Sequence, residues 1–225
     1  MKLLIYGHKN EEIIKLAEKV GFEIVSKNPD MVAVVGGDGT LMKSENDFPE
    51  IPKFILKKSQ TSKKGHDFLP EEILEKLAKK DYKTEDEIKI EATSGNKKIV
   101  GLNEIIVHNI DPRCAIRYEI FINGKKVGGE IIGDGVAIST PYGSTGYYRA
   151  ITDSFFEVGI GVAFNNSTEQ SDHMVLKEDS EVVVKITRGR AIVYADNNDE
   201  EIILDNGNEI LIKKNKKSAK IVKFI

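Results

Sequence analysis

The sequence predicts an α/β plus β protein with two domains. The N-terminal domain is a doubly wound parallel sheet, and the C-terminal domain is β-rich and sandwich-like. In residues 1–85, apolar strand-like runs alternate with amphipathic helical segments, which is the pattern of a parallel sheet with crossover helices. In residues 86–213, short runs with period-two alternation are separated by turn residues, which is the pattern of antiparallel strands. The 225 residues are sufficient for two cores of this kind.

The composition is that of a soluble globular protein, with 40% hydrophobic and 31% charged residues. The formal net charge of −3 gives no indication of nucleic-acid binding. No apolar run approaches the roughly 20 residues that cross a bilayer, so no membrane association is expected. Cys114 is the single cysteine, which excludes an internal disulfide and a thiolate metal cluster. No secretory signal pattern is recognisable, and the expected location is cytoplasmic.

The N-terminal segment begins with a strand, a helix and two further strands. Lys2–Tyr6 is the first predicted strand, and Asn10 is a suitable N-cap for a helix over Glu11–Val20. Phe22–Val25 and Met31–Val35 are the next two strands. Because the last of these is apolar at every position, it is expected to be buried on both faces of a parallel sheet.

A glycine-rich loop, Gly36-Gly37-Asp38-Gly39-Thr40, follows this buried strand. Without a Cβ, the glycines allow the backbone to turn sharply and to approach a ligand closely. A short helix is predicted from Leu41, and its N-terminal N–H groups suit a phosphate, so Gly36, Gly37, Gly39 and Thr40 form a candidate phosphate loop. Lys43 lies on the same turn, as a ligand contact or as an ordinary exposed lysine. The alternative is a tight turn in which Asp38 caps the next helix.

Two further elements complete the first domain. Lys53–Leu56 is a predicted strand, and Pro70 opens a helix over Glu71–Lys79. The segment between them, Lys57–Leu69, is polar. It contains Phe68, which is either a residue that packs on a nucleotide base or an ordinary core phenylalanine.

The second domain contains a clear hairpin signal. Asn123-Gly124 separates the alternating runs Ala115–Ile122 and Lys125–Ile131, and this dipeptide favours a two-residue hairpin turn. Further strands are predicted in this part of the chain at Val136–Ile138, Val162–Phe164, Val182–Ile186 and Ala191–Ala195.

Asn103 and Glu104 interrupt an apolar run at the start of a strand. A carboxylate beside an amide can hold the two hydroxyls of a ribose, because the carboxylate accepts hydrogen bonds and the amide can donate or accept. On spacing alone, a simple turn pair is the better interpretation.

The stretch Gly133–Tyr147 is the most informative in the chain. It contains an acidic glycine turn, a short apolar strand, and then the hydroxyl-bearing residues Ser139, Thr140, Ser144 and Thr145. Such a loop is expected to present backbone amides and hydroxyls to a sugar-phosphate ligand. Tyr142 and Tyr147 offer ring faces for an adenine or a nicotinamide.

These two motifs carry a family resemblance. The glycine-rich loop resembles the signature of a kinase superfamily that includes NAD kinases, diacylglycerol-type lipid kinases and phosphofructokinases. The second stretch resembles NAD kinases alone, with Gly146 in place of the usual alanine. The match covers Asp134, Gly135, Thr140, Pro141, Gly143, Ser144, Thr145 and Tyr147.

The resemblance implies a role for residues in both domains. Asn103-Glu104 corresponds to a pair that grips the dinucleotide ribose, which favours binding over a turn pair. Asp134 is implied as a contact to the dinucleotide, within one subunit or across a subunit boundary. Together with the residue-level reasoning, the candidate NAD contacts are Gly39, Lys43, Phe68, Asn103, Glu104, Asp134, Tyr142, Thr145, Gly146, Tyr147, Tyr148, Arg149, Ala150 and Asn198.

The activity implied by the resemblance is phosphorylation of the 2′-hydroxyl of the adenosine ribose of NAD, giving NADP. Asp38 is then the general base or a metal ligand. The donor is ATP or polyphosphate, with Mg²⁺ or another divalent metal whose ligands the sequence does not identify. A homodimer or homotetramer is implied, as is the return of a final strand, residues 214–225, to the first domain. The alternatives are a diacylglycerol-type lipid kinase and a non-catalytic dinucleotide-binding protein. Residues 57–69 depart from the family pattern, which usually has an apolar, glycine-containing pocket wall there.

Overall fold

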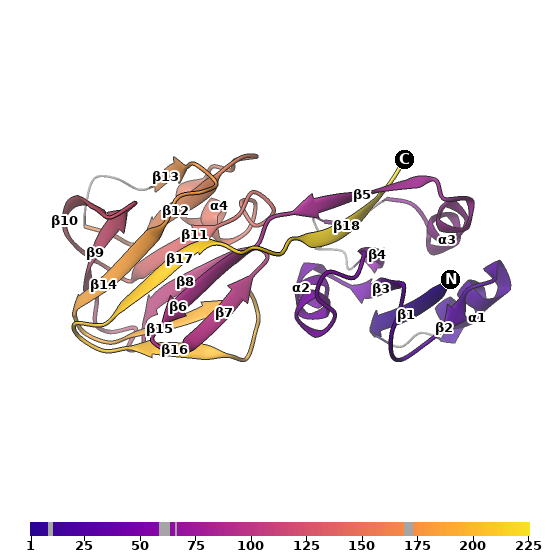
Figure 1. The fold of residues 1–225 in the computed structure, drawn as a ribbon, viewed down its shortest axis with the longest axis horizontal. Coiled ribbons are helices and arrows are strands. Elements are labelled where there is room, and N and C mark those ends of the chain that lie inside the picture. The colour runs from indigo at the N-terminus through magenta and orange to yellow at the C-terminus, as the bar shows by residue number, and fades with distance from the viewer. Residues whose placement is uncertain (9–10, 59–63, 66, 169–172) are drawn as a thin grey trace. The chain divides into compact units, whose positions relative to one another are not determined.

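The computed structural model describes residues 1–8, 11–58, 64–65, 67–168 and 173–225, so the expected N-cap at Asn10 lies outside the described residues. The chain divides into two compact units (Figure 1). Unit 1 comprises Met1–Glu87 together with Ser218–Ile225, and unit 2 comprises Ile88–Lys217. The sequence places the corresponding boundaries after residues 85 and 213.

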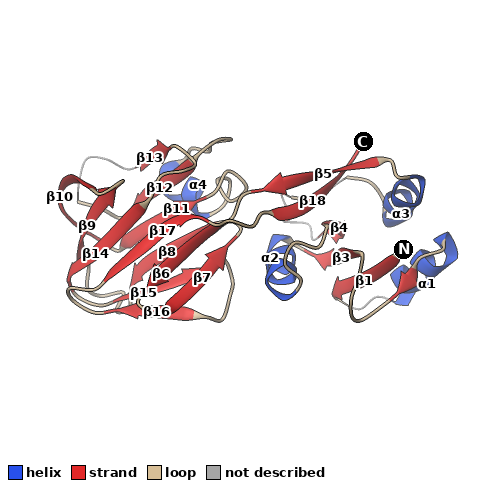
Figure 2. Ribbon diagram, viewed as in Figure 1, coloured by secondary structure: helices blue, strands red, loops and turns tan. Residues whose placement is uncertain are grey.

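Unit 1 is built on a six-stranded sheet (Figure 2). In spatial order its strands are β2 (Glu23–Ile24), β1 (Lys2–Gly7), β3 (Met31–Gly36), β4 (Lys53–Lys58), β18 (Ala219–Phe224) and β5 (Tyr82–Glu87). All neighbouring strands are parallel except β18 and β5, which pair antiparallel. The strand nearest the C-terminus therefore lies inside the sheet formed by the N-terminal segment.

Helices cover both faces of this sheet. The helices are α1 (Glu11–Val20), α2 (Asp38–Asp47) and α3 (Pro70–Lys79). α1 and α3 bury Ile13 and Leu74 in one core cluster with Ala33 and Val35 of β3. Successive strand residues point to opposite faces, so Val34 faces away from that cluster, and α2 packs on β3. The prediction of a doubly wound α/β domain is confirmed.

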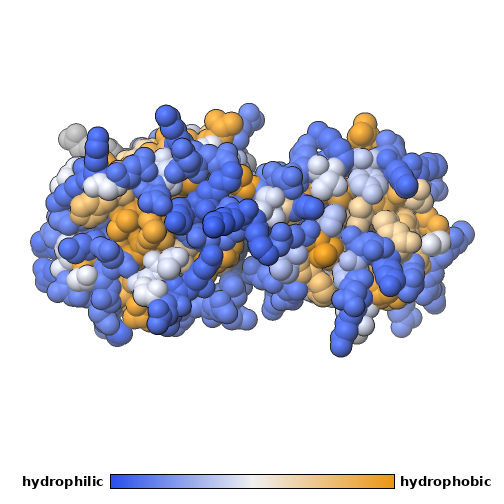
Figure 3. All heavy atoms as spheres, in the orientation of Figure 1, coloured by the Kyte–Doolittle hydropathy of each residue, from blue (hydrophilic) through white to orange (hydrophobic). Residues whose placement is uncertain are grey.

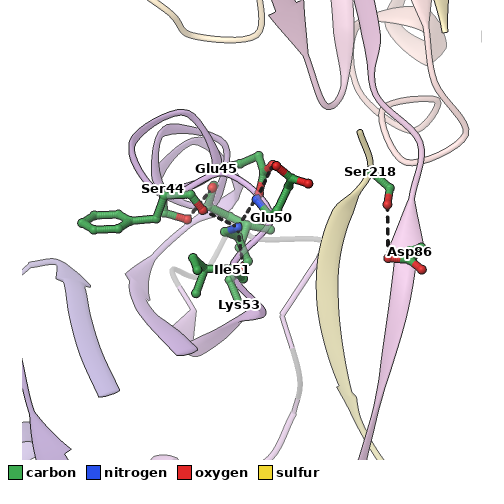
Figure 4. A network of polar contacts seen from close by, with 9 residues as sticks. Ser44, Glu45, Glu50, Ile51, Lys53, Asp86 and Ser218 are labelled. Carbon is green, nitrogen blue, oxygen red and sulfur yellow. Dashed lines mark hydrogen bonds and ion pairs between the residues drawn. The ribbon is translucent and has the colours of Figure 1, made fainter. Parts of the chain in front are cut away.

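A buried ion pair anchors α2 to the start of β4 (Figure 4). Glu45 of α2 and Lys53 of β4 are 3% and 0% exposed, and the Lys53 ammonium donates to the Glu45 carboxylate. The same ammonium donates to the carbonyls of Phe48 and Ile51 at 3.1 and 2.7 Å. With three acceptors for three N–H groups, the buried charge of Lys53 is fully hydrogen-bonded.

Unit 2 is a sandwich of two six-stranded antiparallel sheets. The first sheet contains β10 (Lys125–Gly133), β9 (Ile116–Ile122), β14 (Val182–Arg188), β17 (Glu209–Lys214), β6 (Ile90–Ser94) and β7 (Lys97–Gly101). The second contains β13 (His173–Leu176), β12 (Ile160–Asn165), β11 (Gly135–Ser139), β8 (Glu104–Asn109), β15 (Ala191–Ala195) and β16 (Glu201–Leu204). One continuous apolar cluster joins residues of both sheets, so the β-rich sandwich prediction is confirmed.

The predicted hairpin forms between β9 and β10. Asn123 and Gly124 both have positive φ angles, 50° and 75°, as the two-residue turn requires. Ile122 pairs with Lys125 across the turn.

The outer face of the second sheet carries small side chains where a helix covers it. Ala137 of β11 pairs with Ile106 of β8 and with Ala163 of β12, and these residues cluster with Tyr148. Tyr148 belongs to α4 (Tyr147–Thr152), a short helix that follows β11 in the chain. Because the side chains beneath it are small, α4 lies close against the sheet.

The surface of unit 2 is mostly hydrophilic on the face drawn in Figure 3, with separate apolar spots. Among the helices of the described residues, none has the length and apolar character needed to span a bilayer.

Removing one partner of the buried pair should destabilise unit 1. We expect Glu45→Leu to lower the free energy of unfolding by about 3–5 kcal/mol, because it leaves the Lys53 charge buried without its carboxylate. The double variant Glu45→Leu/Lys53→Met should recover part of this loss, since no charge then remains buried. Urea denaturation followed by far-UV circular dichroism measures both. A double variant as unstable as the single variant would contradict a role for the charge.

Candidate active site

The glycine-rich loop of unit 1 runs directly into α2, which begins at Asp38 and not at Leu41 as predicted. Gly37 takes the N-cap position with an extended backbone, φ −98° and ψ −167°. Its carbonyl accepts hydrogen bonds from the N–H groups of Thr40 and Leu41 at 3.0 and 3.1 Å. Asp38 therefore lies in the first helical turn, where the helix dipole favours a negative charge.

Thr40 packs against two glycines at the ends of neighbouring strands. A Cβ at Gly36 would lie 2.8 Å from the Thr40 Cβ, and a Cβ at Gly7 would lie 2.7 Å from the Thr40 Cγ2. Gly7 also has φ +99°, which disfavours other residues. At Gly36, the absence of a Cβ leaves space that the Thr40 side chain fills. The sequence analysis expects a ligand to approach the backbone there.

The other candidate residues of unit 1 are Asp38, Lys43 and Phe68. Asp38 is half-buried, and its Oδ1 accepts a hydrogen bond from the Lys64 N–H at 3.3 Å, so the divergent segment 57–69 contacts the loop. Lys43 is exposed on α2. Phe68 is 39% exposed, and the Lys76 ammonium lies 4.9 Å from its ring centroid. Phe68 is therefore not an ordinary core residue.

In unit 2, the carboxylate of Asp196 holds the turn that carries Asn103 and Glu104. Its Oδ1 accepts hydrogen bonds from the N–H groups of Asn103 and Glu104 at 2.8 and 3.0 Å, and its Oδ2 accepts from Leu102 at 2.7 Å. The Asp196 N–H in turn donates to the Glu104 carbonyl at 3.0 Å. Sequence reasoning missed this role of Asp196, because the contact spans more than 90 residues.

Residues of the second motif, 133–147, donate hydrogen bonds to the backbone carbonyls of the same turn. The Asn103 carbonyl accepts from the Thr140 N–H at 2.8 Å and from the Ser139 hydroxyl at 3.2 Å, and the Thr140 hydroxyl donates to the Leu102 carbonyl at 2.6 Å. The Ser144 hydroxyl donates to the carbonyls of Pro141 and Phe156, both at 2.8 Å. The hydroxyls of Ser139, Thr140 and Ser144 are thus internal, which corrects the expectation that they face a ligand.

The Asn103 side chain is buried in unit 2. The residue is 7% exposed, and its Oδ1 accepts no hydrogen bond from any residue that the structure describes. A buried acceptor without a donor lowers the stability of the folded protein. An N–H or O–H group of a ligand could satisfy it.

Glu104 lies among residues of α4 and β15. A Cβ at Gly146 would lie 3.5 Å from the Glu104 Oε2. Burial raises the pKa of the Tyr194 phenol, and electrostatic interactions with nearby Tyr147 and Glu104 raise it further. Glu104, Gly146, Tyr147 and Tyr194 are therefore neighbours. Sequence analysis missed Tyr194 because the alternation within 191–195 does not reveal that β15 pairs with β8.

The remaining candidates on this side of unit 2 have different environments. Tyr142 and Tyr148 are 6% and 1% exposed, and the Tyr148 ring packs against Phe156 with 4.9 Å between centroids. Neither ring is available as the open stacking face that the sequence suggests for Tyr142. Thr145 is half-buried before α4, and Arg149 and Ala150 are exposed on α4. The Asn198 Oδ1 accepts from the Glu200 N–H at 3.4 Å.

Asp134 lies at the opposite end of β11 from the Asn103-Glu104 turn. It precedes Gly135, whereas the turn is bonded to Ser139 and Thr140, roughly 20 Å away along an extended strand. Amide groups of Asn109 and Asn166 donate to its carboxylate at 3.2 and 3.0 Å. Within one copy of unit 2, Asp134 is therefore separate from Glu104.

No group of three or more His, Cys, Asp or Glu side chains in the described ranges is arranged to hold a metal ion.

The chain thus consists of a doubly wound α/β unit with an acidic glycine loop and a β-sandwich unit with an amide–carboxylate turn. A family model described as the ATP-NAD kinase C-terminal domain matches residues 102–224. A protein named NAD kinase from Sulfurisphaera tokodaii is 31% identical over 243 residues, covering 100% of this chain and 96% of that protein. The chain belongs to the NAD kinase family of phosphotransferases.

Two solved structures have the same fold. A crystal structure of an NAD kinase from Archaeoglobus fulgidus in complex with ATP has a TM-score of 0.78 at 22% identity, covering 100% of this chain and 93% of that one. The yeast NADH kinase complexed with NADH has a TM-score of 0.82 at 18% identity, covering 100% and 84%. At these identities the similarity establishes the fold alone.

The close packing of Gly143 on the Asn103 backbone gives a stability prediction. A Cβ at Gly143 would lie 2.5 Å from the Asn103 carbonyl carbon, so Gly143→Ala must displace the turn. We expect a loss of about 2 kcal/mol or more in the free energy of unfolding, as for overpacked sites. The matched control is Gly129→Ala, since a Cβ there meets nothing within 4 Å. Equal thermal and urea stability of the two variants would contradict this packing.

Proposed function

We propose that this chain transfers a phosphoryl group from ATP or polyphosphate to the 2′-hydroxyl of the adenosine ribose of NAD, giving NADP. The observation that carries the proposal is the Asn103 side chain, whose buried Oδ1, next to Glu104 in the chain, accepts no hydrogen bond from any described residue. Membership of the NAD kinase family supports the same acceptor.

A ribose fits the hydrogen-bonding capacity of this turn. Its adjacent hydroxyls are donors, and the Asn103 Oδ1 and the Glu104 carboxylate are acceptors. The turn's backbone is bonded to Asp196 and Thr140, so the side chains of Asn103 and Glu104 project from a fixed backbone frame. Tyr147 and Tyr194, which pack against one apolar cluster of this sheet, supply ring surface for the rest of the nucleoside.

Asp38 is the proposed general base. Its carboxylate takes the proton of the 2′-hydroxyl as the hydroxyl oxygen forms its bond to the terminal phosphorus of the donor. The bond from that phosphorus to the leaving ADP, or to the shortened polyphosphate, breaks. Positioning supplies much of the rate in such transfers, and the contacts of Thr40 and the Glu45–Lys53 pair fix the helix that carries Asp38.

A divalent metal ion, Mg²⁺ or another, fits the donor set of unit 1. Mg²⁺ is often held by one or two carboxylates together with substrate phosphates, so ligation of the ion by Asp38, next to a helix N-terminus, is the alternative to its role as the base. When bound, the ion would neutralise charge on the phosphates. The exposed Lys43 and the first turn of α2 add positive potential.

The assignment of roles extends to the units and to the assembly. Residues 1–85 are proposed as the nucleotide-binding domain and residues 86–213 as the NAD-binding domain, in a cytoplasmic homodimer or homotetramer. The position of Asp134, far from Glu104 within one chain, supports a contact to a dinucleotide held by a neighbouring subunit.

The first test is a coupled assay with purified protein, NAD, ATP and Mg²⁺, in which a dehydrogenase specific for NADP detects the product. We expect the wild type to make NADP and Asp38→Asn to lose about 10²-fold or more in turnover, the usual cost of removing a general base. The matched control is Asp47→Asn on the same helix, which can keep its hydrogen bond to the Tyr6 hydroxyl.

Near-normal turnover by Asp38→Asn would remove Asp38 from this role. A wild type that forms no NADP with ATP or with polyphosphate would contradict the proposed reaction. Assays of lipid phosphorylation and of NAD binding without turnover would then distinguish the two alternatives.

A second test uses the unpartnered side chain of Asn103. We expect Asn103→Leu to retain the wild-type melting temperature or to raise it, because a buried acceptor without a partner is replaced by an apolar group of similar shape. The Kd for NAD should rise about tenfold, as expected for one lost hydrogen bond. Differential scanning calorimetry and isothermal titration calorimetry measure the two quantities. Loss of stability together with unchanged NAD affinity would show a purely structural asparagine.

A further inference from the structure

We infer that Asp196 is a positioning residue for the phosphoryl acceptor: its carboxylate fixes the backbone of the Asn103-Glu104 turn, so that both side chains are held for the ribose. The inference rests on the proposed function and assigns to Asp196 no contact with the substrate.

The hydrogen bonds around Asp196 form a closed arrangement. One carboxylate accepts from three successive N–H groups, those of Leu102, Asn103 and Glu104, at 2.7, 2.8 and 3.0 Å. The Asp196 N–H donates back to the Glu104 carbonyl at 3.0 Å. Three successive N–H groups pointing at one acceptor determine the backbone direction at each residue, because each bond weakens steeply when it is misaligned.

Neighbouring residues are adapted to this arrangement. Asp196 has φ +49°, a left-handed conformation that Asp tolerates better than most residues. A Cβ at Gly101 would lie 2.6 Å from the Glu104 carbonyl oxygen and 3.3 Å from the Asp196 Oδ1. The turn therefore closes tightly around the carboxylate, and a glycine is required at its start.

A shift of the turn should weaken NAD binding, because the turn carries the Asn103 side chain. The Asn103 Oδ1 is buried, and its side chain moves with the backbone that carries it, so a small shift of the turn moves the acceptor away from a hydroxyl donor. Displacements of about 1 Å at a positioning group can cost about 10²-fold in rate. Because the turn belongs to unit 2 and the glycine loop to unit 1, the loss should fall on NAD and leave ATP unaffected.

A graded pair of variants tests this. Asp196→Ala removes all three acceptor interactions. Asp196→Asn can keep the two bonds to Oδ1 and replaces the acceptor facing Leu102 with an NH₂ group, so it should be intermediate. The control for general destabilisation is Val184→Ala, which truncates a fully buried side chain on β14, in the other sheet.

Three quantities are measured on the full-length protein. Amide hydrogen exchange reports on residues 102–104, isothermal titration calorimetry gives the Kd for NAD, and steady-state kinetics gives KM for NAD and for ATP. For Asp196→Ala we expect faster exchange at these three amides, a Kd and KM for NAD raised about tenfold to hundredfold, and a KM for ATP within about twofold of wild type. Val184→Ala should lower the melting temperature and leave the KM for NAD unchanged.

The outcomes separate this inference from the proposed function. If the wild type makes NADP and Asp196→Ala retains its Kd and KM for NAD, Asp196 is structural and the inference is wrong, while the proposed reaction stands. Parallel increases in the KM values for NAD and ATP would also overturn it. A wild type that neither binds nor phosphorylates NAD contradicts the proposed function, and the inference falls with it.

Discussion

The candidate site of unit 2 depends on how the backbone polar groups of one turn are satisfied. The turn at residues 102–104 leads into β8, a strand inside the second sheet, and its N–H groups need acceptors away from water. Asp196 supplies these acceptors, while Ser139 and Thr140 supply donors to the carbonyls. Three segments that are distant in sequence are thereby joined at one backbone junction, and each carries candidate ligand contacts.

One glycine from each motif, and Gly101 before the turn, allow close internal packing. Gly143 lies against the Asn103 backbone, Gly101 against Glu104, and Gly36 against the Thr40 side chain. In each case a Cβ would lie within 3 Å of the chain's own atoms. Glycine at these positions thus lets protein segments approach one another closely.

Local sequence signals predicted the fold, and long-range contacts determine the details of the candidate site. The all-apolar run Met31–Val35 and the Asn123-Gly124 turn depend on neighbours in sequence, so both could be identified. The role of Asp196 and the proximity of Tyr194 to Glu104 arise from the pairing of β15 with β8, which no local pattern encodes. The serine and threonine hydroxyls were misassigned for the same reason, because their acceptors are mostly carbonyls brought close by folding.

The sequence allows two interpretations of Asn103-Glu104, a turn pair or a ribose-binding pair. The two interpretations require different hydrogen bonds from the Asn103 side chain. A turn residue of the Asn or Asp type uses its side chain to bond the local backbone. Here Asp196 and Thr140 already bond that backbone, and the Asn103 Oδ1 is buried without bonding any described residue. Its own turn therefore does not use this side chain, and its burial lowers the stability of the fold. Both facts support the proposal that a donor group of a ligand bonds the Asn103 Oδ1.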